Sequence, residues 1–195
     1  MKRFICLVAV ASCLLAQGVS KNVSPNSALI EAAAKGDIVA IDAALAQNAD
    51  INTRDNQGKT PLMLAAYNGH EKAVKHLLDK KADKDLLDPK GWSALACGVS
   101  QQKWDAVMIL LERGVSVNTK DADKGNTPLM WAAYHGNIKV TKNIVGMKAN
   151  VNEVDNAGWT ALMGAIYKAR VDVALFLIEL TGTDVAVKAK DGATA

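Results

Sequence analysis

The sequence predicts an all-α solenoid of about five helix-turn-helix repeats joined by short β-turn hairpins. Residues Gly58–His70 and Gly125–Asn137 agree at nine of thirteen positions and lie 67 residues apart. Related segments open at residues 27, 60, 93, 127 and 160, so their spacings are 33, 33, 34 and 33 residues. Repeats of this length are typical of stacked helical arrays, because one such unit cannot bury its apolar face alone.

The five repeats fill most of the chain. They lie near residues 25–57, 58–90, 91–124, 125–157 and 158–191, within a domain over 24–195, and Thr194-Ala195 repeats the opening once more. Half of the 195 residues are apolar and 22% are charged, which is typical of a folded chain.

The residue pattern of each repeat predicts two helices. Thr60 is a helix N-cap, Pro61 suits the first helical position, and Gly69 ends this helix. The first helix has one face of small residues, which allow a neighbouring helix to approach closely. A second helix follows, with apolar residues at helical spacing: Ala73, Val74, Leu77 and Leu78 in the second repeat, Ala106, Val107, Leu110 and Leu111 in the third, and Val173, Ala174, Leu177 and Ile178 in the fifth.

Turn-forming residues separate the repeats. Sets such as Asp55–Gly58 and Asp88–Gly91 precede the first helix of the next repeat. The set at 121–126 resembles a calcium loop, but its glycine stands one place early and Ala132 takes the position of the closing glutamate. We therefore interpret it as a turn expanded by one residue, which explains the spacing of 34.

These motifs resemble the ankyrin-repeat family. The elements TPL, Ala-Ala, Gly-His, Leu-Leu and Asp-x-x-Gly recur in phase from about Ser24 to the C-terminus. The resemblance implies a stack with a concave face. Two features depart from the family. Methionine, isoleucine or alanine replaces the histidine after TPL, which implies that the hydrogen-bond network of this histidine between turns is weaker or absent. Asn48, Lys81 and Lys148 stand where a loop glycine is usual.

The N-terminus has the layout of a secretory signal peptide over residues 1–18. Lys2 and Arg3 precede an uncharged apolar run from 4 to 16, shorter than the ~20 residues of a membrane-spanning helix. Cleavage after Ala16 or Ser20 is also compatible with the pattern. Two alternatives stay open: a buried N-terminal helix, and a lipoprotein box at 10–13 that would anchor the chain to a membrane through Cys13.

Removal of this segment changes the charge and the cysteine count. It leaves 21 basic and 20 acidic residues, a net charge near +1, which does not favour nucleic-acid or membrane-surface binding. Of three cysteines only Cys97 remains, on a predicted helix, so no internal disulfide can form. We expect a periplasmic or secreted monomer, with membrane attachment only through lipidation.

No residue pattern predicts catalysis, a cofactor or a metal. His70 and His76 lie six residues apart, whereas a zinc helix needs a spacing of four. The sequence contains no glycine-rich phosphate loop and no nucleophile motif. We expect a protein that is not an enzyme.

Aromatic residues gather at the positions that the resemblance implies for partner binding, namely the turn tips and the exposed end of each first helix. Five of the seven Trp and Tyr residues occupy these positions; Trp104 and Trp131 do not. They predict a binding surface, although packing between adjacent turns is an alternative that stays open. The predicted partner-binding residues are Trp92, Trp159, Tyr67, Tyr134, Tyr167, Lys59, Asn68, Lys90, Gln101, His135 and Lys168.

Together these observations favour an exported, non-catalytic protein-binding module. Our first hypothesis is that its concave face inhibits or restrains an envelope enzyme, such as a peptidoglycan hydrolase or peptidase, for self-protection. Two alternatives are a structural adaptor in an envelope complex, for example one supporting an antioxidant enzyme, and an exported effector that binds a host protein.

Overall fold

The computed structural model describes residues 23–195, and within this range it contains ten helices and no strand. The expected signal peptide and Cys13 lie outside the described residues. The helices form five antiparallel pairs. The first helices are α2 (Pro25–Lys35), α4 (Pro61–Asn68), α6 (Ala94–Ser100), α8 (Pro128–His135) and α10 (Ala161–Tyr167). The second helices are α3 (Ile38–Ala46), α5 (Glu71–Asp79), α7 (Trp104–Glu112), α9 (Ile138–Gly146) and α11 (Val171–Glu179).

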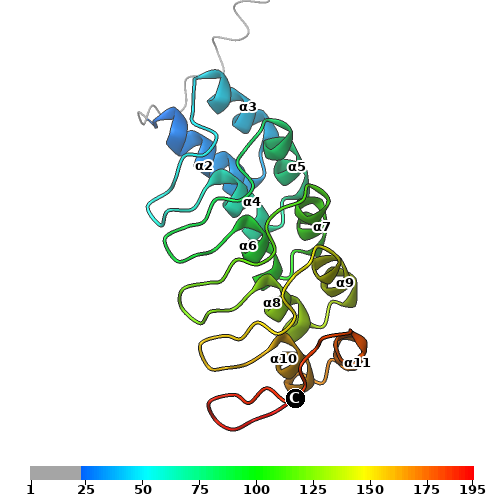
Figure 1. Cartoon of the computed structure of the whole chain (residues 1–195). Helices are drawn as coiled ribbons and strands as arrows, with labels where there is room; N and C mark the ends of the chain where they lie inside the picture. The colour runs from blue at the N-terminus through cyan, green and yellow to red at the C-terminus, as the bar shows by residue number, and fades with distance from the viewer. Residues whose placement is uncertain (1–22) are drawn as a thin grey trace, which may run out of the picture.

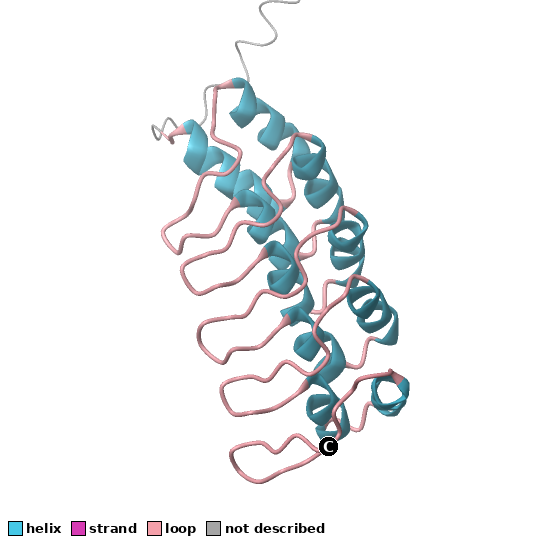
Figure 2. Ribbon diagram, in the orientation of Figure 1, coloured by secondary structure: helices cyan, strands magenta, loops and turns pink. Residues whose placement is uncertain are grey.

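The two helices of each pair belong to two parallel rows. Each first helix packs on the next one along the chain, as α4 does on α2 and α6, and the second helices form the other row (Figure 1). The long turns project from the side of the first-helix row and lie one above another (Figure 2). This arrangement confirms the predicted all-α solenoid. The predicted hairpins are turns without strand pairing in the described residues.

Local chemistry sets the ends of the first helices. The Thr60 hydroxyl accepts a hydrogen bond from the Met63 amide at 3.3 Å, and the Met63 sulfur accepts one from the Thr60 amide at 3.5 Å. Thr127 and Met130 repeat this arrangement. Methionine thus occupies the place of the glutamate in a capping box. Gly69 ends α4 with a φ of 79°, a left-handed conformation that glycine adopts without steric cost.

Small residues bring the first helices close together. Leu62, Ala65 and Ala66 of α4 are at most 1% exposed, and Val74 and Leu77 of α5 are completely buried. The burial of these predicted apolar positions is confirmed. After the second helices, Gly114 has a φ of 67°, and Asn48, Lys81 and Lys148 adopt φ values of 62°, 70° and 65° at the equivalent places. The lysines there cost the fold about 1 kcal/mol each or more.

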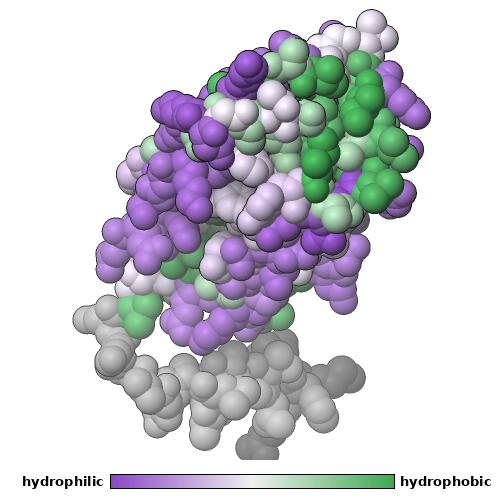
Figure 3. Space-filling view, turned by 90° about the horizontal axis from the view of Figure 1, so that it is seen from below, coloured by the Kyte–Doolittle hydropathy of each residue, from purple (hydrophilic) through white to green (hydrophobic). Residues whose placement is uncertain are grey.

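Apolar side chains are exposed at the C-terminal end of the described stack. Ile178, predicted at an apolar position of α11, is 48% exposed, whereas its counterpart Leu78 is 7% exposed. Figure 3 views this end and shows apolar side chains gathered on the side where α11 lies.

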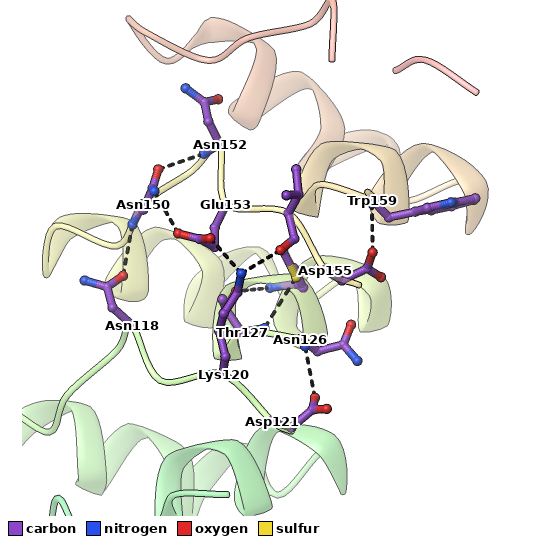
Figure 4. Close-up of polar contacts among 12 residues, drawn as sticks. Asn118, Lys120, Asp121, Asn126, Thr127, Asn150, Asn152, Glu153, Asp155 and Trp159 are labelled. Atoms are coloured by element: carbon purple, nitrogen blue, oxygen red, sulfur yellow. Dashed lines mark hydrogen bonds and ion pairs between the residues drawn. The ribbon is translucent and has the colours of Figure 1, made fainter. Parts of the chain in front are cut away.

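Hydrogen bonds connect the turns of successive repeats, although the family's histidine is missing. Ala122 donates its amide hydrogen to the Lys90 carbonyl at 2.7 Å, and Asn156 donates to the Lys124 carbonyl at 2.7 Å. The Lys120 ammonium contacts the Glu153 carboxylate and the Val154 carbonyl, both at 2.7 Å (Figure 4). Main-chain groups and long side chains thus connect these turns, whereas the expected weakness of the histidine network stays a prediction.

Candidate protein-binding groove

A groove of about 990 Å³ lies between the turn tips and the ends of three first helices, and we call it the central groove. The tips before the second, third and fourth repeats form one wall, and residues of α4, α6 and α8 form the other. Its lining is aromatic and polar: Asn56, Gln57, Gly58, Lys59, Tyr67, Asp88, Pro89, Lys90, Trp92, Cys97, Ser100, Gln101, Asp121, Asp123, Lys124, Asn126 and Trp131.

Two tryptophans from adjacent repeats meet in this groove. The Trp92 and Trp131 ring centroids lie 6.1 Å apart at an interplanar angle of 34°, and both side chains are half-buried. The Trp92 amide donates to Asp88 at 2.9 Å, which fixes its backbone in the turn. Trp131 lies on α8 and stacks on His135 at 6.0 Å. The pair is therefore held in place before any partner arrives, yet part of each ring stays accessible.

A second hollow of about 230 Å³ adjoins the central groove. Trp131, Lys124 and Asn126 line both spaces, and Tyr134 and Trp159 line the second one only. Trp159 packs edge-on against Tyr167, with centroids 5.4 Å apart. Aromatic surface therefore continues from the third repeat to the fifth.

The accessible charge of the central groove is mainly positive. Lys59, Lys90 and Lys124 line it, and the Lys59 ammonium lies 4.9 Å from the Tyr67 ring centroid. Asp88 and Asp121 are only 6% and 4% exposed. Each of these two carboxylates accepts hydrogen bonds from two backbone amides of its own turn. These bonds stabilise the turn and leave the carboxylates little capacity to bind a ligand.

Asp123 is the exposed acidic residue of the groove, and it lies 3.9 Å from the Lys90 ammonium. Farther along, the Lys168 ammonium lies 4.7 Å from the Tyr134 ring and 5.1 Å from the Tyr167 ring. Contact with Tyr134 raises the pKa of Lys168, which keeps this side chain charged at neutral pH.

Comparison with known proteins agrees with this architecture. A family model described as ankyrin repeats (3 copies) matches residues 8–88, 29–121 and 120–189. The chain belongs to the ankyrin-repeat family. Ankyrin repeats mediate protein–protein interaction, and the fold is typically a non-catalytic binding module.

Several curated relatives share about a third of their aligned residues with this chain. The probable 26S proteasome regulatory subunit p28 of Saccharomyces cerevisiae is 32% identical over 72% of this chain and 63% of that protein. The putative ankyrin repeat protein YahD of Escherichia coli K12 is 31% identical over 69% of this chain and 67% of that protein.

Palmitoyltransferase AKR1 of Lachancea kluyveri is 28% identical over 76% of this chain. The alignment spans only 20% of that protein. This chain thus spans less than two thirds of p28 and a fifth of AKR1.

The structure brings five of the predicted partner-binding residues together around the central groove: Lys59, Tyr67, Lys90, Trp92 and Gln101. Tyr134 and Trp159 line the second hollow. Asn68, His135, Tyr167 and Lys168 line neither space. Asn68 donates to the Ala34 carbonyl at 3.0 Å, and His135 lies among the rings of Trp104, Trp131 and Tyr134.

Trp131 and Lys124 line the groove but were absent from the predicted set. Trp131 occupies the place of Leu64 in the second ankyrin repeat, where an apolar residue is usual, so the sequence alone does not distinguish packing from exposure. Lys124 belongs to the turn that is longer by one residue. That insertion was the one available indication that this tip differs from the others.

The pKa shifts of Cys97 and His135 arise from burial, which indicates that these side chains have a packing role. Burial raises the pKa of the Cys97 thiol to about 12, so the thiol stays protonated and unreactive in the folded protein. Burial lowers the pKa of His135. Residues 23–195 contain no group of three or more His, Cys, Asp or Glu side chains placed to hold a metal ion, and in that same range no helix has the length and apolarity needed to cross a bilayer.

Proposed function

We propose that this chain is an exported, non-catalytic binding module whose concave face restrains an envelope enzyme, such as a peptidoglycan hydrolase or peptidase. The observation that carries the proposal is the half-exposed Trp92–Trp131 pair in a groove of about 990 Å³. Aromatic side chains in a partly enclosed site supply much contact area at low entropic cost, and they dominate the binding energy of protein interfaces.

The shape of the groove favours an extended protein segment. Its long axis crosses three repeats, and its walls are turn tips on one side and helix ends on the other. A segment entering from an enzyme's active-site rim would place the rigid array over the mouth of that site. Restraint would then follow from exclusion of substrate, without any catalytic group on this chain.

The charge of the groove favours an acidic segment. Lys59, Lys90 and Lys124 face the groove, while Asp88 and Asp121 are occupied by turn amides and only Asp123 is an exposed acidic residue of the lining. Carboxylates between apolar side chains would pair with the lysines while the apolar side chains contact the tryptophans.

Export is supported by the composition of residues 1–18. A basic start, an uncharged apolar run and small residues after it are typical of a secretory signal peptide. The lone cysteine of the remaining chain, Cys97, is 2% exposed, so the described fold is compatible with an oxidising compartment.

An adaptor role is the second candidate, because p28 is named as a regulatory subunit of a larger assembly. An adaptor would bind its partner through the same groove without changing the partner's turnover. An exported effector would use the groove on a host protein and would leave the producing cell.

A rate assay on envelope extract separates these roles. The purified protein is added to extract, and peptidoglycan hydrolysis and peptide hydrolysis are measured with increasing protein. Restraint predicts a saturable fall in one activity that the Trp92→Ala/Trp159→Ala variant does not produce. Trp104→Ala is the matched control, because this half-buried tryptophan lies outside both hollows. Unchanged rates with retained binding would replace restraint by the adaptor role.

A further inference from the structure

The turn tips of the central groove use their own main-chain amides. In the tip over residues 88–92, every amide hydrogen is donated within the tip at 2.8–3.0 Å, and Pro89 has none to donate. The Asp55 and Asp121 carboxylates occupy amides of the neighbouring tips in the same way. A partner segment therefore cannot add to the middle tip as a β-strand, because strand addition needs free amides on the receiving chain.

Side chains supply the free donors of the groove instead. Asn56, Gln57 and Asn126 line it, and their side-chain amides form no hydrogen bond with any other group of residues 23–195. Each such amide carries two N–H donors. The groove is thus suited to a segment whose carbonyl groups are unpaired and point outward.

A polyproline II segment has carbonyl groups of this kind. It is a left-handed helix of three residues per turn without internal hydrogen bonds. Proline has no N–H, so a proline-rich segment leaves no main-chain donor of its own unpaired in the groove. Its rings pack on aromatic side chains, and Trp92 and Trp131 offer such surface with ring centroids 6.1 Å apart.

The spacing of the repeats matches the period of this helix. Lys90 and Lys124 precede equivalent glycines of successive tips, which lie one above another (Figure 2). Packed helices lie about 8–10 Å apart, which sets the step from one repeat to the next. One polyproline II turn rises about 9.3 Å, so every third residue returns to the same side after one repeat. Three residues of a β-strand rise about 10 Å, but residues three apart point to opposite faces.

Both lysines are available to a partner. Lys90 lies 3.9 Å from Asp123, with the two side chains 67% and 61% exposed, and an exposed pair of this kind contributes little to stability. The Lys124 ammonium forms no ion pair within the described range of 23–195. A carboxylate of the partner can therefore pair with either lysine at little cost.

We propose that the central groove binds a proline-rich segment in the polyproline II conformation that carries an acidic residue at every third position. The carboxylates pair with Lys90 and Lys124, the prolines pack on Trp92 and Trp131, and the segment's carbonyls accept hydrogen bonds from the side-chain amides. This inference rests on the proposed function, and it specifies the kind of segment by which the restrained enzyme is held.

Peptide titrations test this specificity, with the protein as the cell processes it and its N-terminus defined by mass spectrometry. Calorimetry measures the affinity for four repeats of Glu-Pro-Pro. Three peptides of the same length are the controls: Glu-Ala-Ala repeats, which remove the polyproline II preference; Lys-Pro-Pro repeats, which reverse the charge; and a peptide of the same composition with unevenly spaced glutamates. The wild type should bind the Glu-Pro-Pro peptide about tenfold or more tightly than each control.

Matched variants locate the peptide in the groove. Trp92→Ala should weaken binding by about tenfold or more, whereas Trp104→Ala should not. Lys90→Ala/Lys124→Ala should also weaken it, whereas Lys72→Ala/Lys139→Ala, which removes two exposed lysines of second helices, should not. Circular dichroism establishes that each variant is folded.

Two results would overturn the inference. Absence of binding to the Glu-Pro-Pro peptide would overturn it as a whole, and equal or tighter binding of the Glu-Ala-Ala peptide would overturn the polyproline II conformation. Neither result contradicts restraint of an enzyme, because the rate assay on envelope extract measures that separately. A saturable fall in hydrolysis without binding of the proline peptide would retain the proposed function and assign the groove to another kind of segment.

Discussion

Two glycines of the third repeat allow the packing of the turns to be measured. Gly91 and Gly114 have φ values of 77° and 67°, so an alanine is strained at both positions. A Cβ atom at Gly91 would lie 2.4 Å from the Lys120 carbonyl oxygen, whereas at Gly114 it would meet nothing within 4 Å. Gly114→Ala thus measures the backbone strain alone, and Gly91→Ala measures the strain together with the contact between turns.

The structure sets the size of both effects. Gly114→Ala should lower the free energy of unfolding by about 1 kcal/mol, the usual cost of a left-handed non-glycine residue. Gly91→Ala should lower it by about 2–4 kcal/mol, because the turn must also move from Lys120 and loses the 2.7 Å bond between Ala122 and Lys90. Urea unfolding followed by circular dichroism, with linear extrapolation, measures both. Losses that agree within about 0.5 kcal/mol, the scatter of unrelated surface changes, would refute the close packing of the turns.

Three further predictions concern groups outside the tryptophan pair. Cys97 should resist iodoacetamide at pH 8 until urea unfolds the protein, because burial raises its pKa to about 12; equal labelling of folded and unfolded protein would contradict this burial. Lys120→Met should cost about 1 kcal/mol, whereas exposed Lys139→Met should cost little. Lys120 lowers the pKa of Glu153, so this contribution is present above the ordinary pKa of glutamate and is lost as the pH falls through the lowered value; the cost of Lys120→Met should shrink in acid. Burial lowers the pKa of His135, so the unfolded chain binds a proton first as the pH falls below about 6.5, and urea midpoints at pH 7.5 and 5.5 should differ more in the wild type than in His135→Gln.

Short-range patterns predicted most of the fold. Thr60 and Pro61 start α4, Gly69 ends it, and the buried Ala65-Ala66 pair follows from the repeat phase, because caps and helical periodicity act within a few residues of one another. The repeat itself then specifies the neighbours, since each unit meets only the next one.

Contacts that depend on long side chains were harder to predict. The reach of Lys120 to Glu153 and Val154 depends on how far one turn lies from the next, which no local pattern encodes. In the candidate site, the sequence predicts Trp92 and Tyr67 as partner-binding residues, and both line the groove. Trp131 occupies a helix position where an apolar residue is usual, so the sequence indicates a core residue there. Trp131 is half-buried beside the ring of Trp92, and Leu64 is half-buried at the equivalent place of the second repeat.

Trp92 and Trp159 are more informative positions to change than Trp131, because Trp131 contacts other residues of its own helix. Trp131 stacks on His135 and contacts Tyr134, so its removal would disturb α8. The Trp92 and Trp159 rings extend from turns whose backbones are fixed by Asp88 and Asp155 at 2.9 and 2.8 Å. Alanine at these two positions should remove contact area and leave the turns in place.

Capture of partners from envelope extract is the measurement that tests the binding role of the groove most directly. The immobilised wild type, Trp92→Ala/Trp159→Ala and Trp104→Ala are compared by quantitative mass spectrometry. The groove predicts one hydrolase or peptidase that the wild type and the Trp104 control retain and that the double variant releases, with an affinity lowered by about 30-fold or more if each tryptophan is a binding hot spot. Retention of the same proteins by the folded double variant would contradict a partner site in the groove.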